Sequence, residues 1–287
     1  MNIKAFFDHD TSTLTYVVSD PATKEAAIID PVLDYDPMAS RVTKDSLKTV
    51  IQYVQESNLK PLYVLETHAH ADHLSSSQFF KDYFSGIKVM INERICIVQK
   101  TFRDVFNLEK DFQIDGSQFD GLLKMEETYS IGNLKFKVLP TPGHTPACSS
   151  YIFESGNLFS GDAIFMPDSG TGRCDFPMGS ASDLYDSITQ KIYSLPKKTR
   201  IFVGHDYQPN GRGLAYQTSV GEEKSSNIQL RDSTSREEFI KFRTERDKTL
   251  DAPRLLYQSV QFNIRAGHWP PEESNGSSYL KMPLTMG

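Results

Sequence analysis

The segment LETHAHADHL, residues 65–74, holds three of the seven histidines of this 287-residue chain within six positions, together with an aspartate. Neutral imidazole and carboxylate groups are the usual protein ligands of zinc and of non-haem iron. The spacing His-x-His-x-Asp-His cannot place all four side chains on one face of a strand or a helix, but a tight loop can point them at neighbouring positions. We therefore predict a metal site that involves His68, His70, Asp72 and His73.

Three further candidate ligands lie later in the chain, and each comes after an apolar run. His144 follows LKFKVLP, Asp162 follows NLFS and His205 follows RIFV, just as the histidine cluster follows LYVLE. Binding sites of α/β proteins gather where loops leave the ends of strands. If these strand ends share one edge, five histidines and two aspartates meet in a single cleft. The isolated His9 and His268 are interpreted as ordinary surface or core residues.

The elements that must position these groups are short β-rich runs that alternate with helical stretches. Alternating apolar residues predict strands, and a turn at residues 155–157 predicts a hairpin over residues 149–162. Helical spacing predicts helices over residues 46–55 and 180–195, the second with Ser180 as its N-cap and Asp183 as the capping partner. The predicted strands cover residues 13–18, 25–30, 62–66, 87–92, 134–140 and 200–206. This order predicts an α/β fold with strands inside and helices outside.

The composition narrows the class of protein. Hydrophobic residues make up 38% and charged residues 24% of the chain, as in an ordinary globular protein. A net charge of −6 argues against nucleic acid or an anionic membrane as the main partner, and no apolar run approaches the roughly 18 residues of a membrane span. The first ten residues lack the pattern of a signal peptide. Three scattered cysteines, Cys96, Cys148 and Cys174, predict no disulfide framework and favour the reducing cytoplasm.

The chain length allows one large domain or one domain with an extension. After about Val220 the sequence becomes polar and charged, and the stretch SREEFIKFRTERDK is typical of a solvated helix. A proline-rich segment follows. We predict a catalytic domain over residues 1–220 and a C-terminal extension over residues 221–287 that packs on the same domain.

The motifs THAHADH, PTPGHT, SGDA and GHD, in this order, resemble those of the metallo-β-lactamase superfamily, and the resemblance runs from about residue 10 to about residue 215. It implies a four-layered αββα sandwich with the metal site at one edge, in agreement with the strand-end interpretation. The superfamily includes hydrolases with two metals, among them the glyoxalase II thioesterases, and iron dioxygenases with one metal.

Segments outside these motifs resemble the persulfide dioxygenases within the superfamily. The loop GDAIFMPDSGTGRCDFPMG and the later stretch GHDYQPNGRGLAYQTSVGEEKSSN carry this similarity, and the ends NIRAGHWPPEE and SSYLKMPL are similar to the bacterial β-lactamase-hydrolase-like branch. The resemblance implies one Fe(II) per chain, held by His68, His144 and Asp162. Two histidines and one carboxylate leave three coordination positions open, so that a thiol persulfide and O2 can bind side by side. Sulfite and the free thiol are the implied products.

The same ligand residues also fit a two-metal hydrolase. In a mononuclear dioxygenase, the remaining residues His70, Asp72, His73 and His205 would orient the ligands and carry protons. In a glyoxalase II-type site, one metal would be held by His68, His70 and His144, the other by Asp72, His73 and His205, with Asp162 as the bridge. The types of ligand residue fit one Fe(II) ion and also one or two Zn(II) ions. The preference for iron comes from the resemblance.

On the substrate side, the resemblance points to Arg173 and Tyr207. Arg173 either pairs with a carboxylate of a glutathione-like thiol or braces its own loop through Asp175, and Tyr207 either donates its hydroxyl to the substrate or packs beneath the site. Cys174 is a candidate reactive thiol, because the charge of Arg173 could lower its pKa, or else a small buried residue.

One position departs from the pattern of the relatives. Gln229 stands where relatives that use glutathione carry an arginine, so a carboxylate of the thiol carrier would lose that partner. Arg212 and Arg231 are the candidate replacements.

Three functions are therefore compared. The first is an iron-dependent persulfide dioxygenase, which acts on glutathione persulfide or a similar low-molecular-weight thiol persulfide. The second is a two-metal glyoxalase II-type thioesterase or lactonase. The third is a non-catalytic metal-bound sensor, for which an open coordination position would have no purpose. Dimers are common among the relatives, so a homodimer is a candidate assembly, and a separate sulfurtransferase is a candidate supplier of the persulfide.

Overall fold

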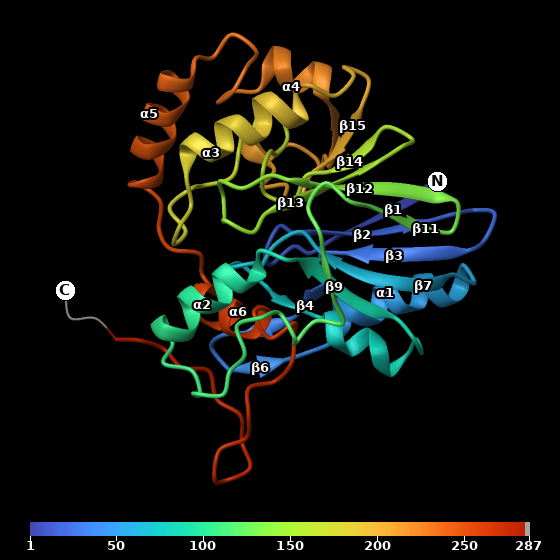
Figure 1. Ribbon diagram of the computed structural model, residues 1–287, viewed down its shortest axis with the longest axis vertical. Helices are drawn as coiled ribbons and strands as arrows, with labels where there is room; N and C mark the ends of the chain where they lie inside the picture. The colour runs from blue at the N-terminus through green and yellow to red at the C-terminus, as the bar shows by residue number, and fades with distance from the viewer. Residues whose placement is uncertain (285–287) are drawn as a thin grey trace.

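Two six-stranded sheets form the centre of the protein in the computed structural model, which describes residues 1–284 (Figure 1). The first sheet has the order β1-β2-β3-β7-β9-β10 and the second the order β11-β12-β13-β14-β15-β16. The strands of the first sheet are β1 (Asn2–Phe7), β2 (Leu14–Ser19), β3 (Glu25–Ile29), β7 (Lys60–Glu66), β9 (Lys88–Asn92) and β10 (Gly121–Leu123). Those of the second are β11 (Thr128–Ile131), β12 (Leu134–Pro140), β13 (Ser149–Phe153), β14 (Asn157–Phe159), β15 (Arg200–Phe202) and β16 (Gln217–Ser219).

Helices cover the outer face of each sheet (Figure 1). On the first sheet lie α1 (Asp45–Glu56), α2 (Ile95–Val105) and α6 (Leu256–Asn263), and on the second lie α3 (Ala181–Asp186), α4 (Val220–Ser226) and α5 (Arg236–Asp247). The minor elements are the strand pairs β4 (Val32–Leu33) with β8 (Leu74–Ser75) and β5 (Tyr35–Asp36) with β6 (Arg41–Val42), and three short helical segments, Ser77–Asp82, Ser187–Ile192 and Pro209–Gly211. The predicted four-layered αββα sandwich is confirmed.

The alternation of side chains along the strands builds two cores. In β2, Leu14, Tyr16 and Val18 belong to the cluster between the sheets, where the Tyr16 ring contacts Phe159 at a centroid distance of 5.1 Å. Val17 points the other way and joins the cluster beneath α1 and α2. Successive side chains of a strand face opposite sides of the sheet, so an apolar run buried on both faces supplies both cores.

The predicted helices form with modest changes. The helix over residues 46–55 is α1, which buries an apolar face of the expected helical spacing. The helix over residues 180–195 begins as predicted, because the Ser180 side chain accepts a hydrogen bond of 3.1 Å from the backbone N–H of Asp183. Its second half, Ser187–Ile192, is wound as a π-helix.

The residues after position 220 pack on both helical layers. Phe239 of α5 is fully buried, and its ring lies 5.9 Å from that of Tyr185. Phe262 of α6 packs in a cluster with Leu33 and Leu74. The predicted solvated helix α5 therefore has one buried side, while the predicted division at residues 220 and 221 stays a prediction. Within residues 1–284, the helices are too short or too polar to span a bilayer.

Candidate metal centre

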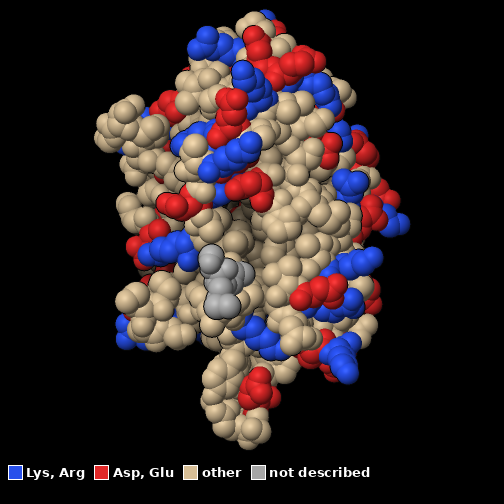
Figure 2. All heavy atoms as spheres, turned by 90° about the vertical axis from the view of Figure 1, so that its left-hand side faces the viewer, with Lys and Arg blue, Asp and Glu red and all other residues tan. Residues whose placement is uncertain are grey.

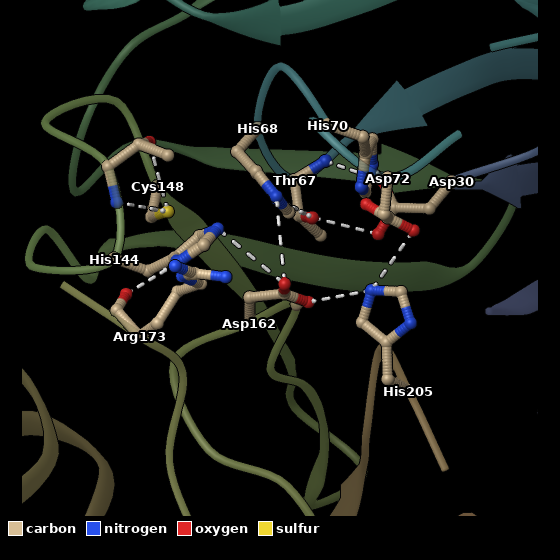
Figure 3. Close-up of polar contacts among 12 residues, drawn as sticks. Asp30, Thr67, His68, His70, Asp72, His144, Cys148, Asp162, Arg173 and His205 are labelled. Atoms are coloured by element: carbon tan, nitrogen blue, oxygen red, sulfur yellow. Dashed lines mark hydrogen bonds and ion pairs between the residues drawn. The ribbon is translucent and has the colours of Figure 1, made fainter. Parts of the chain in front are cut away.

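The candidate ligands lie in loops at one edge of the two sheets. In the second sheet, β12 and β14 are each antiparallel to β13, and β14 is parallel to β15, so β12, β14 and β15 run in one direction. His144, Asp162 and His205 follow these three strands, and their loops meet the loop after β7, which carries His68 (Figure 3). The predicted convergence of strand ends brings together side chains from both sheets.

His68, His144 and Asp162 form a compact group. The Nε2 atoms of His68 and His144 lie 3.9 and 3.6 Å from Asp162 Oδ2, and one ligand atom from each residue falls within 4.8 Å of the others. All three side chains are at least nine-tenths buried. Within the described residues, His68 Nε2 and Asp162 Oδ1 are buried and have no hydrogen-bond partner. Buried polar atoms are normally paired, and so these atoms fit a metal ion held between them.

Hydrogen bonds to the other ring nitrogens orient both histidines. His144 Nδ1 lies 2.7 Å from the carbonyl oxygen of Arg173, which can only accept a hydrogen bond. His68 Nδ1 lies 3.1 Å from Thr67 Oγ1, whose own hydrogen is donated to Asp30 Oδ2 at 2.8 Å. Each Nδ1 therefore carries the ring proton, and each Nε2 presents its lone pair to the site. Burial, reinforced by the nearby His70 and His144, lowers the pKa of His68 well below its usual value and keeps this ring neutral.

His70 lies beside His68, with ring centroids 4.0 Å apart, and one of its ring nitrogens faces two carboxylates. The other, Nδ1, is buried without a partner among the described residues, and His70 also forms a candidate metal group with Asp72 and His73. Nε2 of His70 lies 3.0 Å from Asp30 Oδ1 and 3.4 Å from Glu66 Oε2. Burial opposes a positive charge there, but Asp30 and Glu66 outweigh it and raise the pKa of His70 well above its usual value. Glu66 also accepts hydrogen bonds from the hydroxyl groups of Ser75 and Ser77.

Sequence reasoning missed several residues that support the ligand loop. Asp30 follows β3 directly, the same strand-end signal that identified the other carboxylates, and its carboxylate accepts a 2.7 Å bond from Thr67 N. Asn263 comes from α6, where nothing in the sequence marks it. Its side-chain amide donates to the carbonyl oxygens of His70 and His73 at 2.9 and 2.8 Å.

The other predicted residues form a second group beside the first. His73 Nδ1 lies 3.0 Å from Asp72 Oδ2, and His205 Nε2 lies 3.6 Å from the same oxygen and 3.4 Å from Asp162 Oδ1. Burial opposes a charge on His205, but Asp162 and Asp72 raise its pKa. Burial likewise opposes ionisation of Asp72, whose pKa is held well below its usual value by His205 and His73. Asp162 is thus shared between the two groups of ligand-type residues.

Gly161 allows the Asp162 loop to approach the His68 loop closely. Its φ of +51° lies in the left-handed region, and a Cβ atom added there would lie 2.7 Å from Thr67 Oγ1. Glycine has no Cβ and adopts positive φ readily. In the SGDA motif, the glycine is therefore needed for steric reasons, and the aspartate for its metal-binding carboxylate.

A cavity of about 580 Å³ opens beside the two groups, and its lining includes Asp162, His144, Arg173 and Tyr207. The Arg173 guanidinium binds both carboxylate oxygens of Asp175 at 2.6 Å and the carbonyl oxygen of Asp251 at 2.7 Å. These contacts favour the interpretation of Arg173 as a loop brace. Tyr207 is 55% exposed and stacks on His205 with ring centroids 5.5 Å apart, so it both packs on the site and faces the cavity.

Of the two interpretations of Cys174, the structure favours the small buried residue over the reactive thiol. The side chain is 8% exposed, and burial raises its pKa far above the usual value, which removes the thiolate that reactivity requires. Arg173, expected to stabilise that thiolate, is directed to Asp175 instead. Cys174 is therefore the small buried residue of the alternative interpretation.

Neither expected replacement for the missing arginine lines the cavity. Arg212 forms ion pairs of 2.5 Å with Asp168 and 2.6 Å with Asp206, and Arg231 is exposed outside the lining. Gln229 does line the cavity. Its side-chain oxygen accepts bonds of 3.0 Å from Thr171 Oγ1 and from Arg243 Nη1.

Comparisons with known proteins agree with this geometry. The profile of the Metallo-beta-lactamase superfamily matches residues 10–205. The chain is 47% identical to Glyoxylase B2 of Dictyostelium discoideum, over 98% of this chain and 96% of that protein. It is 45% identical to the Beta-lactamase hydrolase-like protein of Agrobacterium fabrum, over 99% of this chain and 64% of that protein.

Two further relatives carry the name ETHE1. Persulfide dioxygenase ETHE1, mitochondrial, of Bos taurus is 30% identical over 94% of this chain and 90% of its own length. The crystal structure of ETHE1 from Myxococcus xanthus has a TM-score of 0.73 and 32% identity, and the match covers 93% of this chain and all of that one. The predicted resemblance to persulfide dioxygenases and to the β-lactamase-hydrolase-like branch is confirmed. With its αββα sandwich and its histidine and aspartate groups at one edge, the chain belongs to the metallo-β-lactamase superfamily.

Proposed function

We propose that the protein is a mononuclear iron persulfide dioxygenase that acts on a low-molecular-weight thiol persulfide, such as glutathione persulfide. The reaction is RSSH + O2 + H2O → RSH + H2SO3. The two sulfur atoms together lose four electrons, O2 accepts all four, and the S–S bond breaks to release the thiol.

One observation carries this proposal. His68, His144 and Asp162 converge on a common point, where each residue can offer one ligand atom. Two histidines and one carboxylate on a single ion leave coordination positions open for a thiol persulfide and O2, and the similarity to proteins named persulfide dioxygenase supports this function.

Residues of the chain have separate roles around that ion. An Fe(II) ion bound there supplies open coordination positions and the redox chemistry that O2 requires. Nε2 of His68 and of His144 presents a lone pair, because each Nδ1 is occupied by a fixed acceptor. Tyr207 places its ring against His205 at the cavity wall, within the space where the persulfide binds.

Metal analysis combined with oxygen uptake tests the proposal. We expect about one iron per chain in the purified protein, and equal amounts of O2 consumed and sulfite formed with glutathione persulfide. A zinc-loaded protein that consumes no O2, and that gains no oxygenase activity after exchange with Fe(II), would contradict the proposal.

A two-metal thioesterase is the second candidate. The second group, Asp72, His73 and His205, lies next to Asp162, and a relative that is 47% identical is named a glyoxylase. This function predicts about two metals per chain and release of free thiol from S-lactoylglutathione without O2. Absence of hydrolysis in a fully metal-loaded sample would exclude it.

The remaining expectations stay predictions from the sequence. They are the cytoplasmic location, the homodimer and the separate sulfurtransferase. Tight metal binding without turnover of any thiol derivative would instead favour the non-catalytic sensor.

A further inference from the structure

The cavity beside the metal centre is walled partly by the C-terminal extension. Its lining includes Asp162 and His144 of the centre, and also Arg246, Leu250 and Arg254 from α5 and the segment after it. Figure 2 looks onto the side of the molecule that carries α5, where basic and acidic side chains are interspersed above a recess. A volume of about 580 Å³ is within the usual range for small-molecule sites.

Two of the four arginines in the lining are already bound within the protein. Arg173 is held by Asp175 and by the carbonyl oxygen of Asp251. Arg243 is buried, and its Nη2 lies 2.5 Å from Asp247 Oδ1. The hydrogen bonds of these guanidinium groups are already made to acceptors within the protein, so a ligand would gain little binding free energy from them.

Gln229 is occupied in the same way. Its side-chain oxygen accepts a hydrogen bond from Arg243, and its side-chain nitrogen donates to the carbonyl oxygen of Ser169 at 3.1 Å. The amide therefore holds α5 against the loop after Asp162 and has little capacity left for a carboxylate ligand.

The other two arginines remain available. Arg246 is exposed, and its hydrogen bond, from Nη1 to Thr249 Oγ1, is long at 3.3 Å. Arg254 is exposed as well, and within residues 1–284 neither arginine forms an ion pair. Two unpaired cations in the wall of one cavity favour an anionic ligand, and guanidinium groups match carboxylates with paired hydrogen bonds.

We propose that Arg246 and Arg254 bind the carboxylate groups of the thiol that carries the persulfide. This inference rests on the proposed function. These two arginines thereby supply the cationic recognition that Gln229 does not. These contacts lie on the carrier and not on the reacting sulfur, so they bind substrate and transition state equally and act on KM more than on kcat.

Kinetics with matched variants test the inference. Arg246→Gln and Arg254→Gln are each expected to raise KM for glutathione persulfide about tenfold, and the double variant more, with kcat changed less than about twofold. Lys248→Gln removes an exposed cation of the same segment outside the cavity lining, and it should leave KM unchanged. Cysteamine persulfide, which has no carboxylate, should show the same KM with every variant. Equal KM values for glutathione persulfide across the series would overturn the inference.

Direct binding separates this inference from the proposed function. Calorimetric titration of the metal-loaded protein with glutathione requires no O2 and no turnover. Binding that weakens about tenfold or more in the double arginine variant supports the inference, even in a protein that consumes no O2. Binding that is equal in the wild type and in the double variant, or undetectable in both, overturns it.

Discussion

The loop His-x-His-x-Asp-His gives its neighbouring histidines different partners. His68 faces Asp162, whereas His70 faces Asp30 and Glu66. Two carboxylates beside the buried His70 ring raise its pKa, because they offset the cost of burying the charge. The chemical difference between these two residues therefore comes from the neighbours of each ring.

Substitutions at the two aspartates separate the one-metal and two-metal arrangements. Asp162→Ala removes the carboxylate shared by His68 and His144, and we expect iron content to fall below about a tenth of the wild-type value. Asp72→Ala should retain most of the iron, since Asp72 contacts His73 and His205 and not the first group. Elemental analysis measures the iron content of both variants. A loss of about half of the metal in Asp72→Ala would support the two-metal hydrolase.

Glu223 of α4 should give the protein a measurable pH dependence of stability. The side chain is fully buried, Oε1 has no hydrogen-bond partner within the described residues, and burial raises its pKa to about 8. Because the folded pKa exceeds the unfolded value of 4.5, the stabilising contribution is complete below about pH 4.5 and is lost as the pH rises through about 8.

Urea unfolding at several pH values measures this effect. Between pH 5 and pH 8.5 the wild type should lose on the order of 4 kcal/mol more free energy of unfolding than Glu223→Gln, whose amide does not titrate. Glu245→Gln, at an exposed position of α5, is the control and should keep the wild-type slope. Parallel slopes for wild type and Glu223→Gln would contradict the expectation.

At the scale of elements, α5 shows how a helix of mostly charged residues can be essential to the fold. It starts with a capping box formed by Ser235 and Glu238, which satisfies backbone groups of the first turn. Of its two phenylalanines, Phe239 is fully buried against α3, and Phe242 is 41% exposed. The helix therefore contributes to the core mainly through one side chain.

The two phenylalanines make a matched pair for a stability measurement. Phe239→Ala should lower the free energy of unfolding by about 3–5 kcal/mol, because it removes a buried ring and leaves a cavity. Phe242→Ala should cost less than about 1 kcal/mol. Urea denaturation checks both values, and similar losses in the two variants would show that α5 packs differently.

At the scale of the whole molecule, the C-terminal extension supports the metal centre from a distance in sequence. Asn263 of α6 donates to the carbonyl oxygens of His70 and His73 and accepts a 2.8 Å bond from Ser75 N. These three bonds hold the second half of the ligand loop, from His70 to Ser75, against the extension. Buried backbone groups without partners are costly, so this one side chain couples the extension to the geometry of the site.

Asn263→Ala should therefore weaken metal binding although the residue is not a ligand. We expect metal affinity to fall about 10- to 100-fold and the free energy of unfolding to fall by about 2 kcal/mol. Asn275→Ala, in the exposed C-terminal segment, is the control and should change neither. Competition with a chelator measures the affinity, and an Asn263→Ala protein that holds iron as tightly as the wild type would refute this coupling.

Several features of this protein could be predicted because they depend on local patterns. The strand-end positions of His68, His144, Asp162 and His205 follow from the apolar runs that precede them, and the order of the motifs identified the αββα sandwich. Helix α2 was not predicted, although its buried residues have helical spacing. The fold layers and the main metal-type cluster thus follow from residue type, period and motif order.

Other features depend on which distant residues become neighbours, and only the tertiary structure decided them. The sequence placed Arg173 beside Cys174, but the fold turned the guanidinium toward Asp175 and buried the thiol. Asn263 and the two available arginines of the extension have no marker in the sequence, because their roles come from segments that pack together after the chain has folded. Residue type and spacing determine which side chains can bind a metal, whereas burial and charged neighbours determine which of them present a free lone pair to it.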